Sequence, residues 1–105
     1  MPAAARGNGT DSVFSKTGTA KRCRAPVTTS TAVCSGNVFA NGVGIVRIGD
    51  IVAMHLKGGC SPDTSTLSSG SGTVFINGVG AGRIGDQYSS DNTIISGSPT
   101  VFIGG

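Results

Sequence analysis

The sequence predicts an all-β fold assembled from repeated β-hairpins, and three observations lead to that prediction. A seventeen-residue block, residues 36–52, recurs as residues 72–88 with eleven identical positions. Each copy sets short runs of strand-forming residues on both sides of Asn-Gly, which favours a two-residue hairpin turn because both positions tolerate positive φ. Glycine is abundant, at 18 of 105 residues, and helix signals are nearly absent. A fixed period indicates one supersecondary unit used several times.

Each copy is read as a hairpin followed by a second turn. In the first copy, a strand over residues 38–40 leads to the Asn-Gly turn, and a return strand over 45–48 ends in Gly-Asp, which suits another turn. In the second copy, the equivalent strands are 74–76 and 81–84. An arginine precedes each Gly-Asp turn. We expect Arg47 and Arg83 to hold these turns by bonding the aspartate or a backbone carbonyl.

A third copy is split between the two chain ends, over residues 1–11 and 98–105. Thr100–Ile103 repeats Thr73–Ile76 and stops at Gly-Gly where the other copies turn at Asn-Gly. The missing half of this copy can be aligned with the start of the chain, where Arg6 takes the position of the repeat arginine and Asp11 that of the repeat aspartate. The C-terminal strand would then pair with the N-terminal strand and close a three-unit ring. We therefore expect one domain over residues 1–105.

The predicted core is small. Hydrophobic residues make up 37% of the chain, and there is no tryptophan. Three phenylalanines, Phe39, Phe75 and Phe102, hold the same repeat position, and we expect them to meet near a pseudo-threefold axis. Ordering so much glycine costs more backbone entropy than ordering any other residue. A ligand or partner is therefore expected to add stability.

Three cysteines and one histidine are the candidate metal ligands. Cys23, Cys34 and Cys60 are an odd number, so a disulfide framework would leave one thiol over. The opening residues lack the apolar stretch of a signal peptide, so we expect synthesis in a reducing cytoplasm, where clustered cysteines more often bind metal. With His55 they would supply three thiolates and one imidazole, a structural zinc set, with iron as the second choice. A disulfide with a spare thiol, or inert buried cysteines, are the alternatives.

Other function classes find little support. The basic run of Lys16, Lys21, Arg22 and Arg24 and the net charge of +3 could suit nucleic acid. No aromatic residue is interleaved there for stacking, so a solvated loop is favoured. One histidine and five aspartates without glutamate leave no catalytic constellation. We expect no enzyme activity and no small-molecule substrate.

Taken together, these motifs resemble PAAR-repeat proteins, the family that caps the spike of contractile injection machines. The resemblance rests on Pro2-Ala3-Ala4-Ala5-Arg6, on two Val-Phe-x-Asn-Gly blocks followed by Arg-Ile-Gly-Asp, and on the ending Gly97–Gly105. It spans most of the chain. The N-terminal motif has one alanine more than the family name, and histidine is scarcer than the family's usual set, so thiolates would replace imidazoles.

The resemblance implies a fold, a metal and a partner. Family members are small glycine-rich β cones of three hairpin units with a metal near the apex, which here implies Cys23, Cys34, His55 and Cys60. Their base sits on a trimeric β-helical spike, which implies one copy of this chain per trimer and transient contact with a target envelope. A phage baseplate spike is favoured over a type VI secretion spike because of the cysteine-bearing segment before the first full repeat, which implies a place in the virion. A free-standing metal-binding module is the alternative.

Overall fold

All the regular structure is β in the computed structural model, which describes residues 2–15, 27–53, 55–57, 61–63, 65–89 and 92–104. This described part contains no helix, and so none of a length and hydrophobicity that could cross a membrane. The prediction of a small all-β fold is confirmed. Its strands are short: β1 (Ser12–Ser15), β2 (Val27–Ser30), β3 (Phe39–Ala40), β4 (Val43–Gly44), β5 (His55–Lys57), β6 (Ser61–Asp63), β7 (Phe75–Ile76), β8 (Val79–Gly80), β9 (Gln87–Tyr88) and β10 (Asn92–Ile94).

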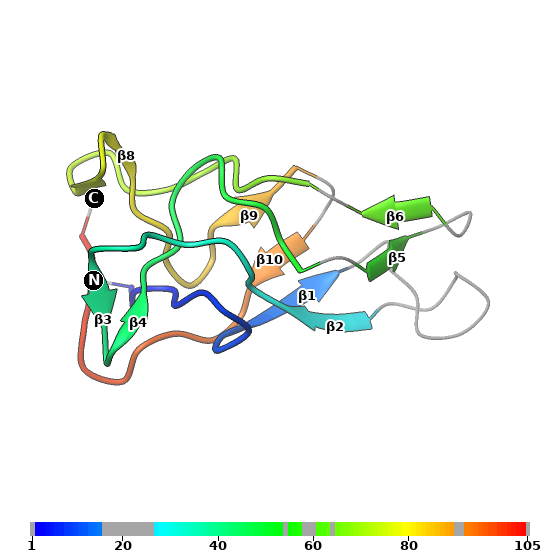
Figure 1. Cartoon of the computed structure of the whole chain (residues 1–105), viewed down its shortest axis with the longest axis horizontal. Coiled ribbons are helices and arrows are strands. Elements are labelled where there is room, and N and C mark those ends of the chain that lie inside the picture. The colour runs from blue at the N-terminus through cyan, green and yellow to red at the C-terminus, as the bar shows by residue number, and fades with distance from the viewer. Residues whose placement is uncertain are drawn as a thin grey trace.

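The strands form one antiparallel sheet and three hairpins along an elongated molecule of about 38 × 23 × 23 Å. The sheet has the order β2-β1-β10-β9, and the hairpins are β3–β4, β5–β6 and β7–β8. Figure 1 shows β3, β4 and β8 at one end of the long axis together with both chain ends. We call this end the base. The β5–β6 hairpin lies toward the opposite end, and the sheet lies between the two (Figure 1).

The two predicted Asn-Gly turns are present at the base. Asn41 and Gly42 have φ of 53° and 79°, and Asn77 and Gly78 have φ of 54° and 85°, which places all four in the left-handed region that asparagine and glycine tolerate best. The turns join strands of two residues, with Phe39 opposite Gly44 and Phe75 opposite Gly80. Hairpin formation is therefore explained by the turn residues more than by the length of the strands.

The two chain ends pair in the same way without a connecting turn. Ala3 lies opposite Phe102, the Ile103 amide donates to the Pro2 carbonyl at 2.8 Å, and the Ala4 amide donates to the Val101 carbonyl at 2.9 Å. This pairing makes the C-terminal strand part of the base.

The predicted return strands differ from those in the structure. Each hairpin has two residue pairs. Beyond them, residues 45–48 and 81–84 form single bridges with neighbouring segments, namely Arg6 with Ile45, Arg47 with Ala81, and Ala4 with Arg83. At the centre, three amides form a closed ring: Ala5 donates to Gly82 (3.0 Å), Gly82 to Val46 (2.7 Å), and Val46 to Ala5 (3.0 Å). The three segments therefore circle a common axis, which single-strand propensity cannot reveal.

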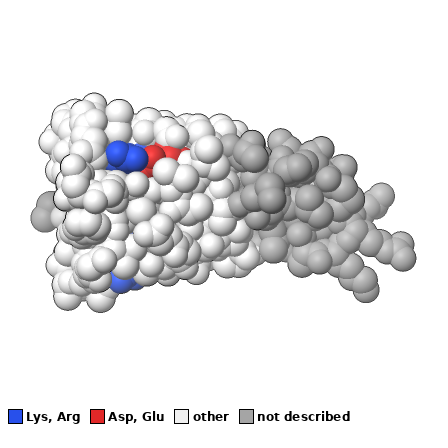
Figure 2. Space-filling view, viewed as in Figure 1, with Lys and Arg blue, Asp and Glu red and all other residues white. Residues whose placement is uncertain are grey.

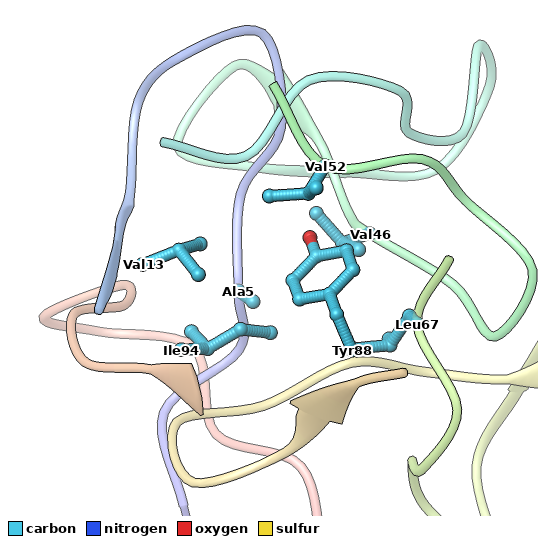
Figure 3. Packing of buried hydrophobic residues seen from close by; sticks show 7 residues of the cluster. All are labelled: Ala5, Val13, Val46, Val52, Leu67, Tyr88 and Ile94. Carbon is cyan, nitrogen blue, oxygen red and sulfur yellow. The ribbon is translucent and has the colours of Figure 1, made fainter. Parts of the chain in front are cut away.

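The buried side chains form two clusters around this axis. The cluster nearer the base is made of small and branched residues: Ala4, Ala40, Ile45, Ile76, Ala81 and Ile103. The other, drawn in Figure 3, lies toward the four-stranded sheet and contains Ala5, Val13, Val46, Val52, Leu67, Tyr88 and Ile94. Tyr88 is its largest member, and burial together with the charge of Asp50 raises the pKa of the Tyr88 hydroxyl. The expectation of a small core around a common axis fits these clusters.

The expectation that three phenylalanines meet at the axis is wrong. Phe39, Phe75 and Phe102 are 56%, 61% and 50% exposed. The next residue of each strand is the one that turns inward, because successive side chains of a strand point to opposite faces. Those residues, Ala40, Ile76 and Ile103, are buried.

Candidate functional site

The candidate functional surface is the base, where three equivalent phenylalanines are exposed. Phe39 belongs to β3, Phe75 to β7, and Phe102 to the C-terminal strand. Val38 and Val74, the residues before two of them, are each 37% exposed. Large exposed apolar patches commonly mark protein or membrane contacts. The arrangement can therefore supply an apolar contact repeated around an axis.

An arginine clamp holds each base turn from the neighbouring unit. In the clamp on the second turn, Arg47 donates to Asp50 through Nε and Nη2, both at 3.0 Å, and through Nη1 to Asn77 Oδ1 at 3.0 Å. Ser35 Oγ donates to the same Asn77 oxygen at 2.9 Å. A guanidinium forked on a carboxylate is held in one orientation, so the turn it contacts is held too.

The same clamp occurs at the other two turns. Arg6 pairs with Asp11 at 2.8 Å and reaches Asn41 Oδ1 at 3.4 Å, an oxygen that also accepts from Ser98. At the third turn, Arg83 pairs with Asp86 at 3.0 Å and donates to the carbonyl of Gly104 at 3.4 Å. Ser71 also donates to that carbonyl, at 2.6 Å. Each unit therefore holds the turn of the next, and the three clamps close a ring.

The predicted role of Arg47 and Arg83 in holding their Gly-Asp turns is confirmed by these ion pairs. The contact of each arginine with the next unit was not predicted, and neither were the serines that share it. A signal is nevertheless present, because serine precedes the repeated block in all three places, at Ser35, Ser71 and Ser98. Each serine hydroxyl also accepts from backbone amides two and three residues later.

Asp11 is the most enclosed of the clamp carboxylates, at 1% exposed. Burial on its own would raise the pKa of Asp11, but hydrogen bonds from the Arg6 side chain, the Arg6 amide and Ser96 outweigh it and hold the pKa below the ordinary 3.8. The folded state therefore favours the ionised carboxylate more than the unfolded state does. Its contribution to stability is complete above pH 3.8 and is lost as pH falls through the lower folded pKa.

We expect the free energy of unfolding to fall as pH is lowered from 5 to 2, and to fall less in Asp11→Asn. The amide keeps the shape but removes the ionisation that is linked to folding. Denaturant unfolding at several pH values, followed by circular dichroism, measures both slopes. Parallel curves for the two proteins would show that Asp11 does not carry the pH dependence.

The predicted metal ligands fall mostly outside the described residues. Cys23 and Cys60 are not among them, and only the backbone of His55 is described, as the first residue of β5. Cys34 is described as a free, partly buried thiol packed against the cluster of Figure 3. Among the described side chains there is no group of three histidine, cysteine or acidic residues that could hold an ion. The metal site stays a prediction.

The described charges cancel locally. Each charged side chain that the structure describes belongs to one of the three arginine–aspartate pairs. In Figure 2 adjacent blue and red atoms mark one such pair on the side of the molecule, and a second blue patch lies at the lower edge. Among the described side chains, the base therefore presents no unpaired charge that an apolar partner would have to desolvate.

A comparison with protein families identifies the C-terminal part of the chain. The model of the PAAR motif matches residues 57–105. No curated protein matches the chain. The matched segment contains β7, β8 and the C-terminal strand with Phe102, which supply two of the three base phenylalanines. The chain thus carries a PAAR motif over residues 57–105, which is consistent with the predicted resemblance to PAAR-repeat proteins.

Proposed function

We propose that this chain is a spike tip that binds the blunt end of a trimeric β-helical spike through its base, one copy per trimer. The PAAR motif supports a spike-tip role in a contractile phage tail or a type VI secretion system. PAAR proteins are structural tips rather than enzymes. The observation that carries the proposal further is the identity of the three exposed phenylalanines at the base.

At equivalent buried positions, the three units do not all carry the same residue type. One unit combines Ala40 with Ile45, whereas the second combines Ile76 with Ala81. The third follows the second, with Ile103 and Ala4. Each unit thus contributes one isoleucine and one alanine to the cluster, but at exchanged positions. The fold therefore tolerates unequal units as long as the total volume is kept.

At the base, by contrast, the exposed positions carry the same residue types in all three units. All three units carry phenylalanine preceded by valine, although the phenylalanine is at least half exposed in each. Folding does not require an exposed phenylalanine, and three of them at one end are an aggregation risk. Equal apolar groups around an axis are what a partner with threefold symmetry would contact. Three equal contacts made together also raise the affinity without any single strong site.

We favour a phage baseplate spike over a type VI spike, which would place this protein in the virion. The argument for this choice is the cysteine-bearing segment before the first full repeat. The opposite end of the molecule would meet the target envelope transiently. A zinc ion near that end, with iron as the second choice, is part of the proposal. Its ligands would come from the predicted set, of which Cys23, His55 and Cys60 fall outside the described side chains.

Single alanine substitutions at the base test the proposal. Phe39→Ala, Phe75→Ala and Phe102→Ala should each weaken binding to the trimeric spike protein of the same particle by about 10-fold, because each removes one of three buried aromatic contacts. The three losses should agree within about threefold. Biolayer interferometry with immobilised spike measures the dissociation constants.

Phe14→Ala is the matched control for this series. Phe14 is 39% exposed but belongs to β1 of the four-stranded sheet, away from the base. Its substitution should leave the dissociation constant unchanged. Equal losses for Phe14→Ala and the base variants, or no loss for any base variant, would contradict docking through the base.

A further inference from the structure

The three units meet along three seams that have the same backbone pairing. In each seam the residue after the clamp arginine donates its amide to a carbonyl of the next unit: Gly7 to Gly44 at 2.8 Å, Ile48 to Gly80 at 2.9 Å, and Ile84 to Ala3 at 3.0 Å. Each seam also contains the residue before the turn serine, which is Cys34, Gly70 or Gly97. The three seams can therefore be compared position by position.

In two seams an isoleucine lies between the units, with Ile48 partly buried and Ile84 40% exposed. A Cβ placed on Gly70 would lie 3.0 Å from Ile48 Cγ1, and one placed on Gly80 would lie 2.9 Å from Ile48 Cδ1. At the next seam, a Cβ on Gly97 would lie 3.1 Å from Ile84 Cγ1. The isoleucine of one unit thus lies over the glycine backbone of the other.

In the third seam the side chain comes from the opposite side. The isoleucine position is Gly7, and a Cβ placed there would lie 2.3 Å from Cys34 Cβ and 2.6 Å from Cys34 Sγ. A Cβ placed on Gly44 would lie 2.8 Å from the same sulfur. Cys34 therefore occupies the space that Ile48 and Ile84 occupy in the other seams, and Gly7 is the glycine that makes room for it.

Strand pairing also separates Cys34 from His55. Thr31 lies opposite Val52 in an antiparallel bridge, so residues after Thr31 and residues after Val52 run in opposite directions. Cys34 and His55 are each three residues beyond the bridge on opposite sides of it, so their backbones diverge, by up to about 20 Å at about 3.3 Å per residue of extended chain. Figure 1 agrees, because β5, which begins at His55, lies far from the base. Two ligand atoms of one zinc lie within about 4 Å of each other.

We propose that Cys34 is the packing residue of the third seam and not a metal ligand. The predicted set of Cys23, Cys34, His55 and Cys60 then loses one member, and any metal near the far end is held without it. One side chain packs in each of the three seams, but in the third seam that side chain comes from a different position of the repeat unit. Cysteine content and spacing alone cannot distinguish this packing role from ligation, because the seam forms only when two units meet.

A double-mutant cycle between positions 7 and 34 tests the packing role. Cys34→Gly should lower the melting temperature by about 8 °C or more, because it empties the seam of a small domain. Gly7→Ile should also lower it in the wild type, where it collides with Cys34. In the Cys34→Gly background, Gly7→Ile should instead raise the melting temperature and recover at least half of the loss. Failure of the double variant to recover, or to fold, would overturn the packing role.

Cys34→Val tests the metal claim separately and keeps the seam filled. Zinc content per chain, measured by elemental analysis before and after incubation with one equivalent of zinc, should equal that of the wild type. Its melting temperature should also stay within about 5 °C, since valine is close in size to cysteine. Loss of bound zinc in Cys34→Val would show that Cys34 is a ligand and would refute the proposal. Neither experiment depends on binding to the spike.

Discussion

Deleting Thr100–Gly105 is expected to leave a chain that does not fold. The deletion removes Ile103, which is 4% exposed and packs in the cluster nearer the base. It also removes the partners of the Ala4 and Ser71 hydrogen bonds, namely the carbonyls of Val101 and Gly104. One of the three clamps disappears, and a strand edge and apolar interior are exposed together, which a domain of 105 residues cannot absorb.

Circular dichroism with thermal melting, and gel filtration of the soluble fraction, measure this outcome. Phe102→Ala is the matched control, because it keeps the strand and removes only an exposed side chain, and it should melt as the wild type does. A truncated chain that unfolds cooperatively would show that the C-terminal strand is an appendage and that the ring does not need it.

Gly44→Ala is expected to destabilise the fold by about 3 kcal/mol or more, in the range of severe overpacking. The added Cβ would lie 2.0 Å from the Ser35 carbonyl oxygen and 2.8 Å from Cys34 Sγ. The Ser35 backbone cannot move away freely, because its amide donates to the Ile45 carbonyl at 2.9 Å. The cause is close approach and not backbone conformation, since the φ of Gly44 is not positive.

Gly36→Ala provides the control for this substitution. A Cβ at Gly36 meets no atom within 4 Å, so its effect should stay within about 0.5 kcal/mol. Urea unfolding of both variants gives the two free energies. Equal stability of Gly44→Ala and Gly36→Ala would mean that the seam is much looser than the structure shows.

The local turns of this fold can be predicted from the sequence because their cause is local. The Asn-Gly pairs need only their own tolerance of positive φ, and Arg47 and Arg83 need only an aspartate three residues later. The match between the two chain ends is also visible in the sequence, because Thr100–Ile103 repeats an internal segment. Each of these features depends on residues close in the chain or on direct repetition.

The features that escaped prediction depend on the neighbouring unit. Phe39 and Ala40 are both in a two-residue strand, and only the position of the axis decides which one is buried. After Gly44, residues 45–48 pair with neighbouring units instead of with their own hairpin, and no local signal in the sequence marks this change of partner. Ser35 and Cys34 likewise act across a seam. The serine recurs at the equivalent position of all three units, so aligning the units in the sequence is enough to identify it.

The stoichiometry of the complex tests the central claim most directly. Mixing the full chain with the trimeric spike protein of its own particle and weighing the complex by native mass spectrometry should give one copy of this chain per three spike chains. That ratio follows from a base whose three equal contacts occupy all three spike subunits at once. No complex, or a complex with three copies of this chain per trimer, would contradict the account.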